Sequence, residues 1–198
     1  MSEKELLEKI RSGNEAAFLE LYNAWQNTIF RFAVQMTGSK SLAEDITQDV
    51  FMLLIRKNVA FDPQKGSFSS FLYGIARNFS MRTLRKHFRH QGIFSIFKSS
   101  KDEPVAQSNP LMDLSENETT QNLRRCILSL PPRYREVIVL CDLHELTYME
   151  AANAINTEVG TIRSRLHRGR ELLAQKLRSS ASARQENKGG TPYELPAL

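Results

Sequence analysis

Four arginines and one histidine fall within the segment "GTIRSRLHRGR", residues 160–170. Arginine can pair with phosphate oxygens, and its planar fork can also pair with two acceptors on the edge of a guanine base. On a helix, which turns by about 100° per residue, Ile162 and Leu166 share one side, and His167 and Arg168 point away from it. This arrangement suits a helix in the major groove of DNA, but an amphipathic helix with solvated charges gives the same pattern. The residues before this segment are needed to choose between the two interpretations.

Those preceding residues predict a helix-turn-helix. Thr147 and Glu150 have the spacing of a capping box at the start of the short segment "YMEAANAI". Asn156 can adopt the left-handed backbone conformation that a sharp turn between two helices needs. A short helix, a tight turn and a second, basic helix form the motif that places its second helix in the major groove of duplex DNA. The residues expected on the DNA side or its flanks are Thr161, Arg163, Ser164, Arg165, His167 and Arg168.

A second group of cations lies in "GSFSSFLYGIARNFSMRTLRKHFRH", residues 66–90, which contains no acidic residue from Ala76 onward. Aromatic residues alternate with these cations. The combination suits single-stranded nucleic acid, whose bases stack on rings while its phosphates meet cations. We expect Phe71 and Phe79 in the core. The candidate nucleic-acid contacts are Tyr73, Asn78 and the later cations, among them Arg82, Arg85 and Lys86.

Carboxylates gather in "LAEDITQDVFMLL", residues 42–54, at Glu44, Asp45 and Asp49. Carboxylates on one helix do acid–base or metal chemistry only when histidine or further acids are brought to the same place. An enzyme would need His87 or His90 beside them, and the sequence has no HxxxH or DxD cluster. We therefore expect no catalytic residue, no metal and no cofactor, and interpret the helix as a polar surface for docking a protein. Its exposed side is expected to carry Asp45, Gln48, Asp49 and Met52.

Helical periodicity covers most of the chain and is lost from about residue 91 to residue 118. Ser41 with Glu44, and Ser67, predict two helix starts in the first half. The stretch without periodicity is polar and contains proline, so we expect a linker. Its apolar residues 93–97 are either a stray element on a core or a segment that docks into a partner.

We predict an all-α fold of two small helical domains joined by a flexible linker. The C-terminal domain is the helix-turn-helix. The boundaries are 1–90 for the N-terminal domain, 91–118 for the linker, 119–178 for the C-terminal domain and 179–198 for a disordered tail.

Composition limits the class of protein further. The chain has 198 residues, 41% hydrophobic and 25% charged, which is ordinary for a globular protein. Its net charge of +5 fits a polyanionic partner such as nucleic acid. Cys126 and Cys141 lie among apolar residues without CxxC spacing, so we expect free thiols. No apolar run approaches the roughly 18 residues of a membrane span, and the N-terminus differs from a signal peptide. We expect a cytoplasmic protein without membrane insertion.

Three blocks together resemble the extracytoplasmic-function (ECF) sigma factors of bacterial RNA polymerase. They are "AEDITQDVF", "FDPQKGSFSSFLYGIARNFSMRTLRK" and "LPPRYREVIVLCDLHELTYMEAANAINTEVGTIRSRLHRGRELL", in the family's order and spacing. The resemblance implies that the first block binds the clamp helices of the largest subunit of core RNA polymerase. Residues near that contact would be Asp45, Gln48, Asp49, Phe51 and Met52.

The resemblance also implies how promoter DNA is read. The second block would recognise and open the minus-ten element, with a flipped base near the loop at residues 61–68, and the helix-turn-helix would read the minus-thirty-five element as duplex. Polymerase would supply the chemistry, so the chain is not an enzyme. Many members are held inactive by an anti-sigma factor, a further expected partner. The implied minus-ten contacts are Phe61, Ser67, Tyr73, Arg77, Asn78, Arg82, Arg85 and Lys86.

The sequence departs from the family pattern at three positions. Asn156 replaces a usual glycine, Ala151 a larger aliphatic residue, and Gly169 a common alanine. The last two are expected to loosen packing by up to about 1 kcal/mol each. The alternative function is a helix-turn-helix regulator that binds DNA without polymerase. The third block fits this alternative equally well, whereas the first two blocks do not.

Overall fold

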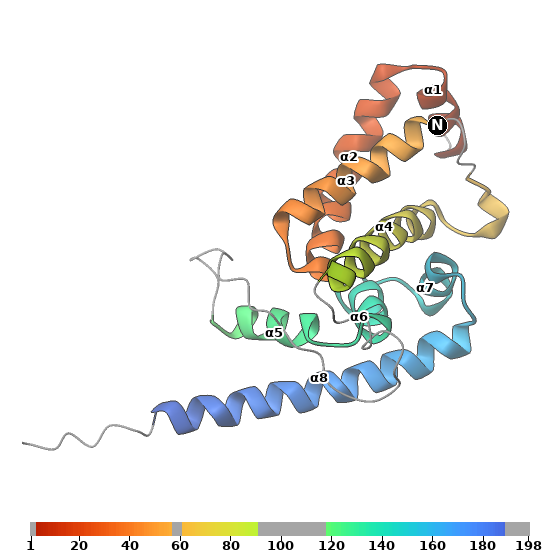
Figure 1. Cartoon of the computed structure of the whole chain (residues 1–198). Helices are drawn as coiled ribbons and strands as arrows, with labels where there is room; N and C mark the ends of the chain where they lie inside the picture. Colours follow the sequence, from red (N-terminus) through yellow and green to blue (C-terminus); the bar gives the residue numbers. More distant parts are fainter. Residues whose placement is uncertain (1–2, 57–60, 91–117, 189–198) are drawn as a thin grey trace, which may run out of the picture.

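The computed structural model describes residues 3–56, 61–90 and 118–188, and all regular structure in these ranges is helical (Figure 1). This confirms the predicted all-α fold. The predicted linker, apart from its last residue, lies outside the described residues, and so do residues 93–97. The first half contains α1 (Glu3–Arg11), α2 (Glu15–Thr37), α3 (Lys40–Ile55), the 3₁₀ turn η1 (Pro63–Lys65) and α4 (Phe68–His90). The second contains α5 (Glu118–Leu128), α6 (Pro132–Ile138), the π-helical turn η3 (Val139–Leu143), α7 (Tyr148–Ile155) and α8 (Val159–Lys188).

Local capping sets the helix starts in the N-terminal half, α1–α4. Gly38 has a φ of 74°, which reverses the chain after α2, and Ser39 then accepts a hydrogen bond from the backbone N–H of Leu42 at 3.3 Å. The prediction that Ser41 begins this helix is therefore wrong by two residues, because the first residue after the glycine turn already supplies the cap. Ser67 caps α4 as predicted, accepting from the N–H of Ser70 at 3.3 Å.

The C-terminal half, α5–α8, contains the predicted helix-turn-helix. Thr147 and Glu150 form the capping box of α7, and Asn156 ends α7 with a φ of 56°. An asparagine tolerates this left-handed conformation, so the missing glycine does not prevent the turn. The second helix of the motif, α8, continues to Lys188. The prediction of disorder from residue 179 is thus wrong for residues 179–188, which contain neither glycine nor proline to stop the helix.

Gly169 lies where α8 crosses α6. A Cβ atom at this position would lie 3.2 Å from Cγ1 of Ile138, which is closer than ordinary van der Waals contact. α6 and α8 therefore lie so close together that the side chain of an alanine at this position would be crowded. The expectation that Gly169 loosens this packing is wrong. Ala151 is fully buried in α7.

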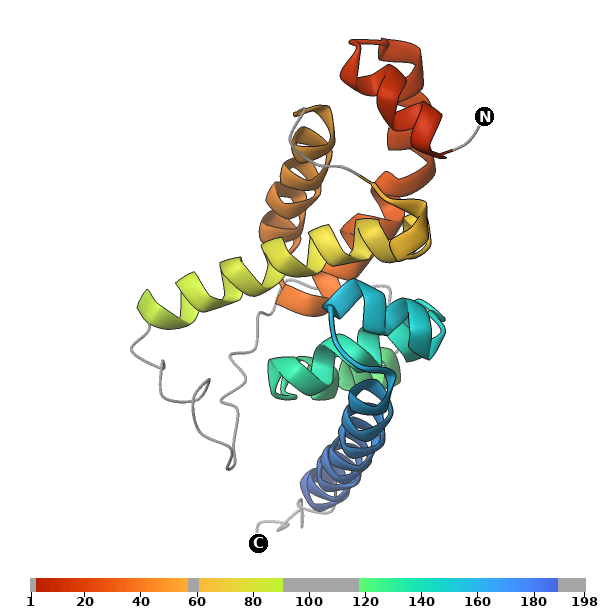
Figure 2. The ribbon, with the colours of Figure 1, turned by 90° about the vertical axis from the view of Figure 1, so that its right-hand side faces the viewer.

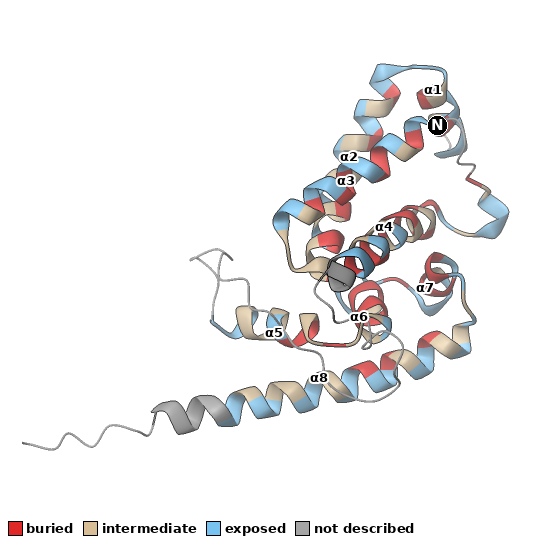
Figure 3. Cartoon of the chain, viewed as in Figure 1, coloured by how far each residue is buried: buried red, intermediate tan, exposed pale blue. Residues whose placement is uncertain are grey.

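The two halves lie against each other rather than apart (Figures 1 and 2). In the N-terminal half, α2, α3 and α4 pack together; in the C-terminal half, α8 packs on α5, α6 and α7. Across the boundary, α4 lies on α7, and the buried residues of both halves form one hydrophobic cluster (Figure 3). None of the helices in the described ranges is both long and apolar enough to cross a lipid bilayer.

Arg135 joins the halves through backbone atoms. Its guanidinium, buried on α6, donates to the carbonyl oxygen of Met36 near the end of α2 at 2.6 Å. It also donates to the carbonyl oxygens of Leu128 and Leu130 at the end of α5. A cation is favourable at the C-terminal ends of helices, where carbonyl groups lack helical partners. Burial lowers the pKa of Arg135 to about 10, so it stays charged at neutral pH.

Candidate protein and nucleic-acid interfaces

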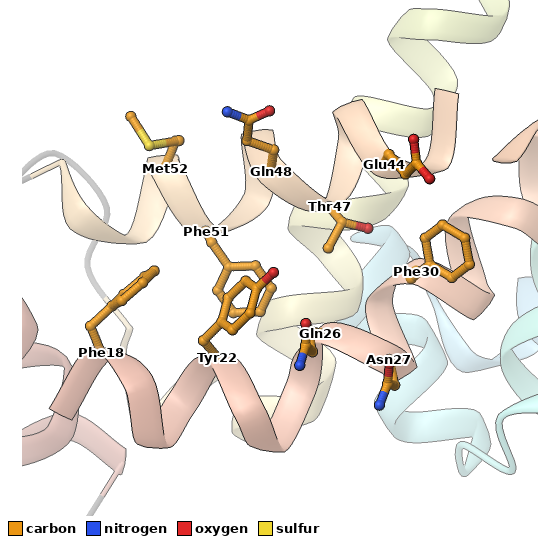
Figure 4. Close-up of a pocket in the computed structure, with 10 residues that line it drawn as sticks. All are labelled: Phe18, Tyr22, Gln26, Asn27, Phe30, Glu44, Thr47, Gln48, Phe51 and Met52. Carbon is orange, nitrogen blue, oxygen red and sulfur yellow. The ribbon is translucent and has the colours of Figure 1, made fainter. Parts of the chain in front are cut away.

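The exposed face of α3 lies beside a groove between α2 and α3 (Figure 4). Asp45, Gln48, Asp49 and Met52 are exposed, as predicted, and Met52 exposes 43% of its surface. Phe51 is different, because only 2% of it is exposed. Its ring forms part of the floor of the groove, and its place near a protein contact stays a prediction.

The groove has a volume of about 570 Å³ and an aromatic floor. The ring of Phe51 lies 4.8 Å from that of Tyr22 and 6.3 Å from that of Phe18, measured between centroids. Figure 4 shows Gln48 and Met52 on the side of α3 turned away from these rings. An apolar floor bordered by polar side chains is the usual composition of a protein–protein interface. The lining residues are Phe18, Tyr22, Gln26, Asn27, Phe30, Glu44, Thr47, Gln48, Phe51 and Met52.

The start of α8 has the two sides that the sequence predicts. Ile162 and Leu166 are buried, and Ser164, His167 and Arg168 are exposed. Thr161 is half-buried at the helix start and Arg163 is exposed, with its guanidinium carbon 5.9 Å from the ring centroid of Tyr148. His167 and Arg168 both reach Glu171, at 3.4 Å and 3.1 Å.

Arg165 lies apart from this exposed side. Its guanidinium is 3.3 Å from Glu136, a carboxylate on α6 whose side chain is only 1% exposed. The same carboxylate is 2.8 Å from the guanidinium of Arg77 on α4. Arg165 and Arg77, expected at different parts of the promoter, are thus held by one buried acid.

The exposed basic surface of α4 is formed by residues three or four positions apart. Asn78, Arg82 and Arg85 share one face of the helix, Lys86 follows beside them, and all four are exposed. Cations in a row on a helix can follow a phosphate backbone. This part of the predicted minus-ten surface is accessible.

The earlier part of α4 is covered. Tyr73 is only 4% exposed, and its hydroxyl lies 2.8 Å from Nδ1 of His144. Phe61 is 9% exposed and packs on the rings of Phe68 and Phe71 at 5.3 Å and 5.4 Å. The expectation that Tyr73 and Phe61 are open to bases is therefore corrected for this arrangement: both rings are packed. Phe79 and Phe71 lie against the core, as expected.

Ser67 also contacts the C-terminal half, donating to Glu150 Oε1 at 3.1 Å. Sequence reasoning missed the acids Glu136 and Glu150 as partners of α4. The sequence offered one signal for Glu136, an acid directly before the apolar run at residues 137–140, which predicts burial and hence a need for a cation.

His144 of the C-terminal half bonds to two residues of the N-terminal half. Its Nε2 lies 2.8 Å from Oε1 of Gln35, and this geometry fits a neutral ring that donates to Gln35 and accepts from Tyr73. Burial, with a smaller contribution from the charge of Arg31, lowers the pKa of His144 to about 4. Burial raises the pKa of Tyr73 to about 12. Glu145 and Glu150 line the same shallow pocket as His144, whose volume is about 340 Å³.

The acids of α3 are not brought together with other metal-ligating side chains in the described ranges. Within residues 3–56, 61–90 and 118–188, no three histidine, cysteine, aspartate or glutamate side chains come together in a way that could hold a metal ion. Glu44, Asp45 and Asp49 are exposed neighbours on one helix.

Two protein-family models match this chain. One, described as sigma-70 region 2, matches residues 21–90, and the other, described as sigma-70, region 4, matches residues 120–173. The chain is 29% identical over 184 residues to the ECF RNA polymerase sigma factor SigW of Bacillus subtilis, covering 88% of this chain and 96% of the relative. It is 31% identical over 159 residues to SigM of the same organism, covering 78% of this chain and 91% of the relative.

The fold is similar to a solved structure of the sigma factor RpoE in complex with the anti-sigma factor NepR from Bartonella quintana. The TM-score is 0.61 and the identity 23%, over 81% of this chain and 96% of the other. At that identity the likeness supports the helical architecture and no residue assignment.

Proposed function

We infer the roles of this chain's surfaces from one premise. The chain belongs to the sigma-70 family and is an ECF RNA polymerase sigma factor, a protein that directs transcription initiation. Sigma factors are not enzymes, and the polymerase carries out the reaction. We propose in addition which surfaces act, and the exposed helix faces described above support each assignment.

The α2–α3 surface is assigned to core RNA polymerase, with the clamp helices of its largest subunit as partner. The groove of about 570 Å³ between two helices supports this assignment, because an amphipathic helix binds such a surface through its apolar face. Asp45, Gln48, Asp49 and Met52 would form the exposed contact, and Phe51 would hold the groove in shape.

The α4 surface is assigned to the minus-ten element as a melted strand. Asn78, Arg82, Arg85 and Lys86 are exposed in a row that can follow a single strand. Tyr73 and Arg77 would join them only after the C-terminal half has moved away, and Ser67, which is exposed, after its bond to Glu150 has opened. Phe61 would join them only if its packing on Phe68 and Phe71 of the N-terminal half also opens. Unstacking a base costs a few kcal/mol, which aromatic and cationic contacts can offset.

The start of α8 is assigned to the minus-thirty-five element as duplex. Ser164, His167 and Arg168 are exposed on its outer side, with Thr161 and Arg163 beside them. The buried seam of Ile162 and Leu166 supports this docking, because it holds the helix with its other side outward. Arg165 is assigned a phosphate contact only if its pair with Glu136 opens.

The observation that carries these assignments is that one chain holds three exposed surfaces: a groove for protein, a basic row, and a helix-turn-helix. The test is binding to core polymerase. Asp49→Arg is expected to weaken the complex at least about tenfold, whereas Glu8→Arg makes the same charge change on α1 and should leave it unchanged. If the unmodified chain forms no complex at micromolar concentrations, the alternative of a polymerase-independent regulator is favoured.

An anti-sigma factor is proposed as a further partner. The solved structures with the same fold include RpoE with NepR and CnrH with the cytosolic domain of CnrY. Affinity capture with the chain as bait, repeated with Asp49→Arg, would report whether such a partner shares the α3 surface.

A further inference from the structure

The outward side of α8 carries an acid among its cations. From residue 159 to residue 178 the chain has six arginine and lysine residues and a single carboxylate, Glu171. Seven residues make nearly two full turns of a helix, so Glu171 lies on the same side as Ser164. A carboxylate on a side that meets DNA opposes binding, because the phosphates repel it. The effect of Glu171 on its neighbours is therefore a question about how α8 meets DNA.

The carboxylate of Glu171 is shared between two neighbouring side chains. Its Oε1 lies 3.4 Å from Nε2 of His167, and its Oε2 accepts a hydrogen bond from Nη1 of Arg168 at 3.1 Å. The side chains of His167 and Arg168 are 79% and 59% exposed, against 49% for Glu171, so both stay open to a ligand. The bond takes one of the five N–H donors of the guanidinium, and a guanine edge needs two. Arg168 can therefore keep its bond to Glu171 while it reads a base.

The three side chains contribute little to the stability of the fold. They are neighbours three or four positions apart on the exposed side of one helix, and exposed ion pairs of this kind change stability only slightly. The pair of Arg165 with Glu136 is the contrast, because that acid is buried and joins α6 to α8. The effect of Glu171 is therefore expected on what His167 and Arg168 bind.

Arg168 can bind DNA in two ways that differ in specificity. A guanidinium on a phosphate raises the affinity for every sequence, whereas a guanidinium on a base edge raises the affinity for particular sequences. Glu171 favours the base edge for two reasons. It fixes one nitrogen of the guanidinium beside His167, and its negative charge repels a phosphate that approaches the remaining donors. Discrimination is a difference between two affinities, so it increases when the less specific complex is weakened.

We propose that Glu171 is a positioning residue for the reading of duplex DNA, which holds His167 and Arg168 toward base edges and disfavours their binding to phosphates. The consequence is a lower affinity for DNA of arbitrary sequence and a stronger preference for the cognate duplex. This role rests on the proposed function, which assigns α8 to duplex DNA, and goes beyond it by giving an acid a part in specificity.

The test compares variants that change the charge at one position. Glu171→Gln removes the charge and keeps the side-chain shape. Glu8→Gln makes the same change of net charge on the exposed side of α1 and is the matched control. Arg168→Ala, alone and combined with Glu171→Gln, completes a double-mutant cycle. Thermal melting followed by circular dichroism checks that every variant folds like the unmodified chain.

The probes are a duplex selected from a random pool by the unmodified full-length chain, and the unselected pool itself. Binding is measured by fluorescence anisotropy between about 50 and 200 mM salt. We expect Glu171→Gln to bind the unselected pool about threefold more tightly and to steepen the salt dependence by about one counterion. Its preference for the selected duplex should fall by about threefold or more. Glu8→Gln should change none of these quantities, and without Arg168 the effect of Glu171→Gln should be much smaller.

An unchanged preference for the selected duplex in Glu171→Gln would overturn the proposal. An equal effect of Glu171→Gln with and without Arg168 would also overturn it, because the acid would then act as a plain charge and not through its partner. If the unmodified chain enriches no duplex, the proposal is overturned together with the assignment of α8 to duplex DNA. That outcome is recognised before any variant is measured, so the two failures are distinguishable.

Discussion

Glu136 offers a quantitative test of how the two halves are held. Its carboxylate is 2.8 Å from Arg77 and 3.3 Å from Arg165, and its side chain is 1% exposed. Glu136→Ala removes the acid and leaves two guanidinium groups facing each other across the boundary. The perturbation therefore acts through uncompensated charge more than through lost volume.

The expected magnitude follows from burial. Removing one partner of a buried ion pair destabilises a protein by about 3–5 kcal/mol. Here the arginine side chains are 20% and 31% exposed, so water can partly replace the carboxylate, and we expect a loss near the lower limit, about 3 kcal/mol. The matched control is Asp142→Ala. Asp142 pairs with Arg170 at 2.5 Å, but the side chains are 27% and 56% exposed, so at most about 1 kcal/mol should be lost.

The assay is equilibrium unfolding in urea, followed by circular dichroism at 222 nm. Glu136→Ala should lower the midpoint while the slope stays unchanged, since the surface exposed on unfolding is the same. Equal stability losses for Glu136→Ala and Asp142→Ala would refute the reasoning, because they would show that burial does not govern the energy of this pair.

Three further outcomes are expected. The contact between the halves should weaken as pH falls from about 6.5 toward 4, because the buried contact lowers the pKa of His144 and thus favours its neutral ring. Emission from Trp25, the single tryptophan of the chain, which lines the pocket beside His144, should shift over this pH range. A shift that persists in His144→Gln would contradict the assignment of this pH dependence to His144. Gly169→Ala should not raise the melting temperature despite alanine's better helix propensity, because its Cβ would lie 3.2 Å from Ile138; a clear rise measured by calorimetry would show that α6 and α8 have room to move. Thr147→Ala should cost about 1 kcal/mol in urea unfolding through loss of the α7 capping box, and a loss below a few tenths would indicate that tertiary packing alone sets the start of α7.

The helix-turn-helix was predictable because its signals are local. The cap at Thr147, the left-handed turn at Asn156 and the seam of Ile162 with Leu166 each depend on residues within about two turns of one another. The same holds for the exposed side of α3. Patterns of this kind fix which side of a helix is buried and leave open what covers it.

The contact between the halves was not predictable for the same reason. Arg77 and Glu136 are 59 positions apart, and Gln35 and His144 are 109 apart, so no periodicity connects them. Tyr73 was expected among nucleic-acid contacts because its neighbours are cations, but its own side of α4 packs on the other half. Two neighbouring sides of one helix can thus face different surroundings, here the C-terminal half and solvent.

The bonds of Arg135 bear on how this arrangement can change over evolutionary time. All its acceptors are main-chain carbonyl oxygens, at Met36, Leu128 and Leu130. A carbonyl oxygen is present whatever side chain its residue carries, so substitutions at those three positions leave the acceptors in place. The pair of Arg77 with Glu136, in contrast, is lost when either side chain changes. Drift in sequence would therefore be expected to alter the strength of the contact between the halves through Glu136, and to leave its geometry anchored at Arg135.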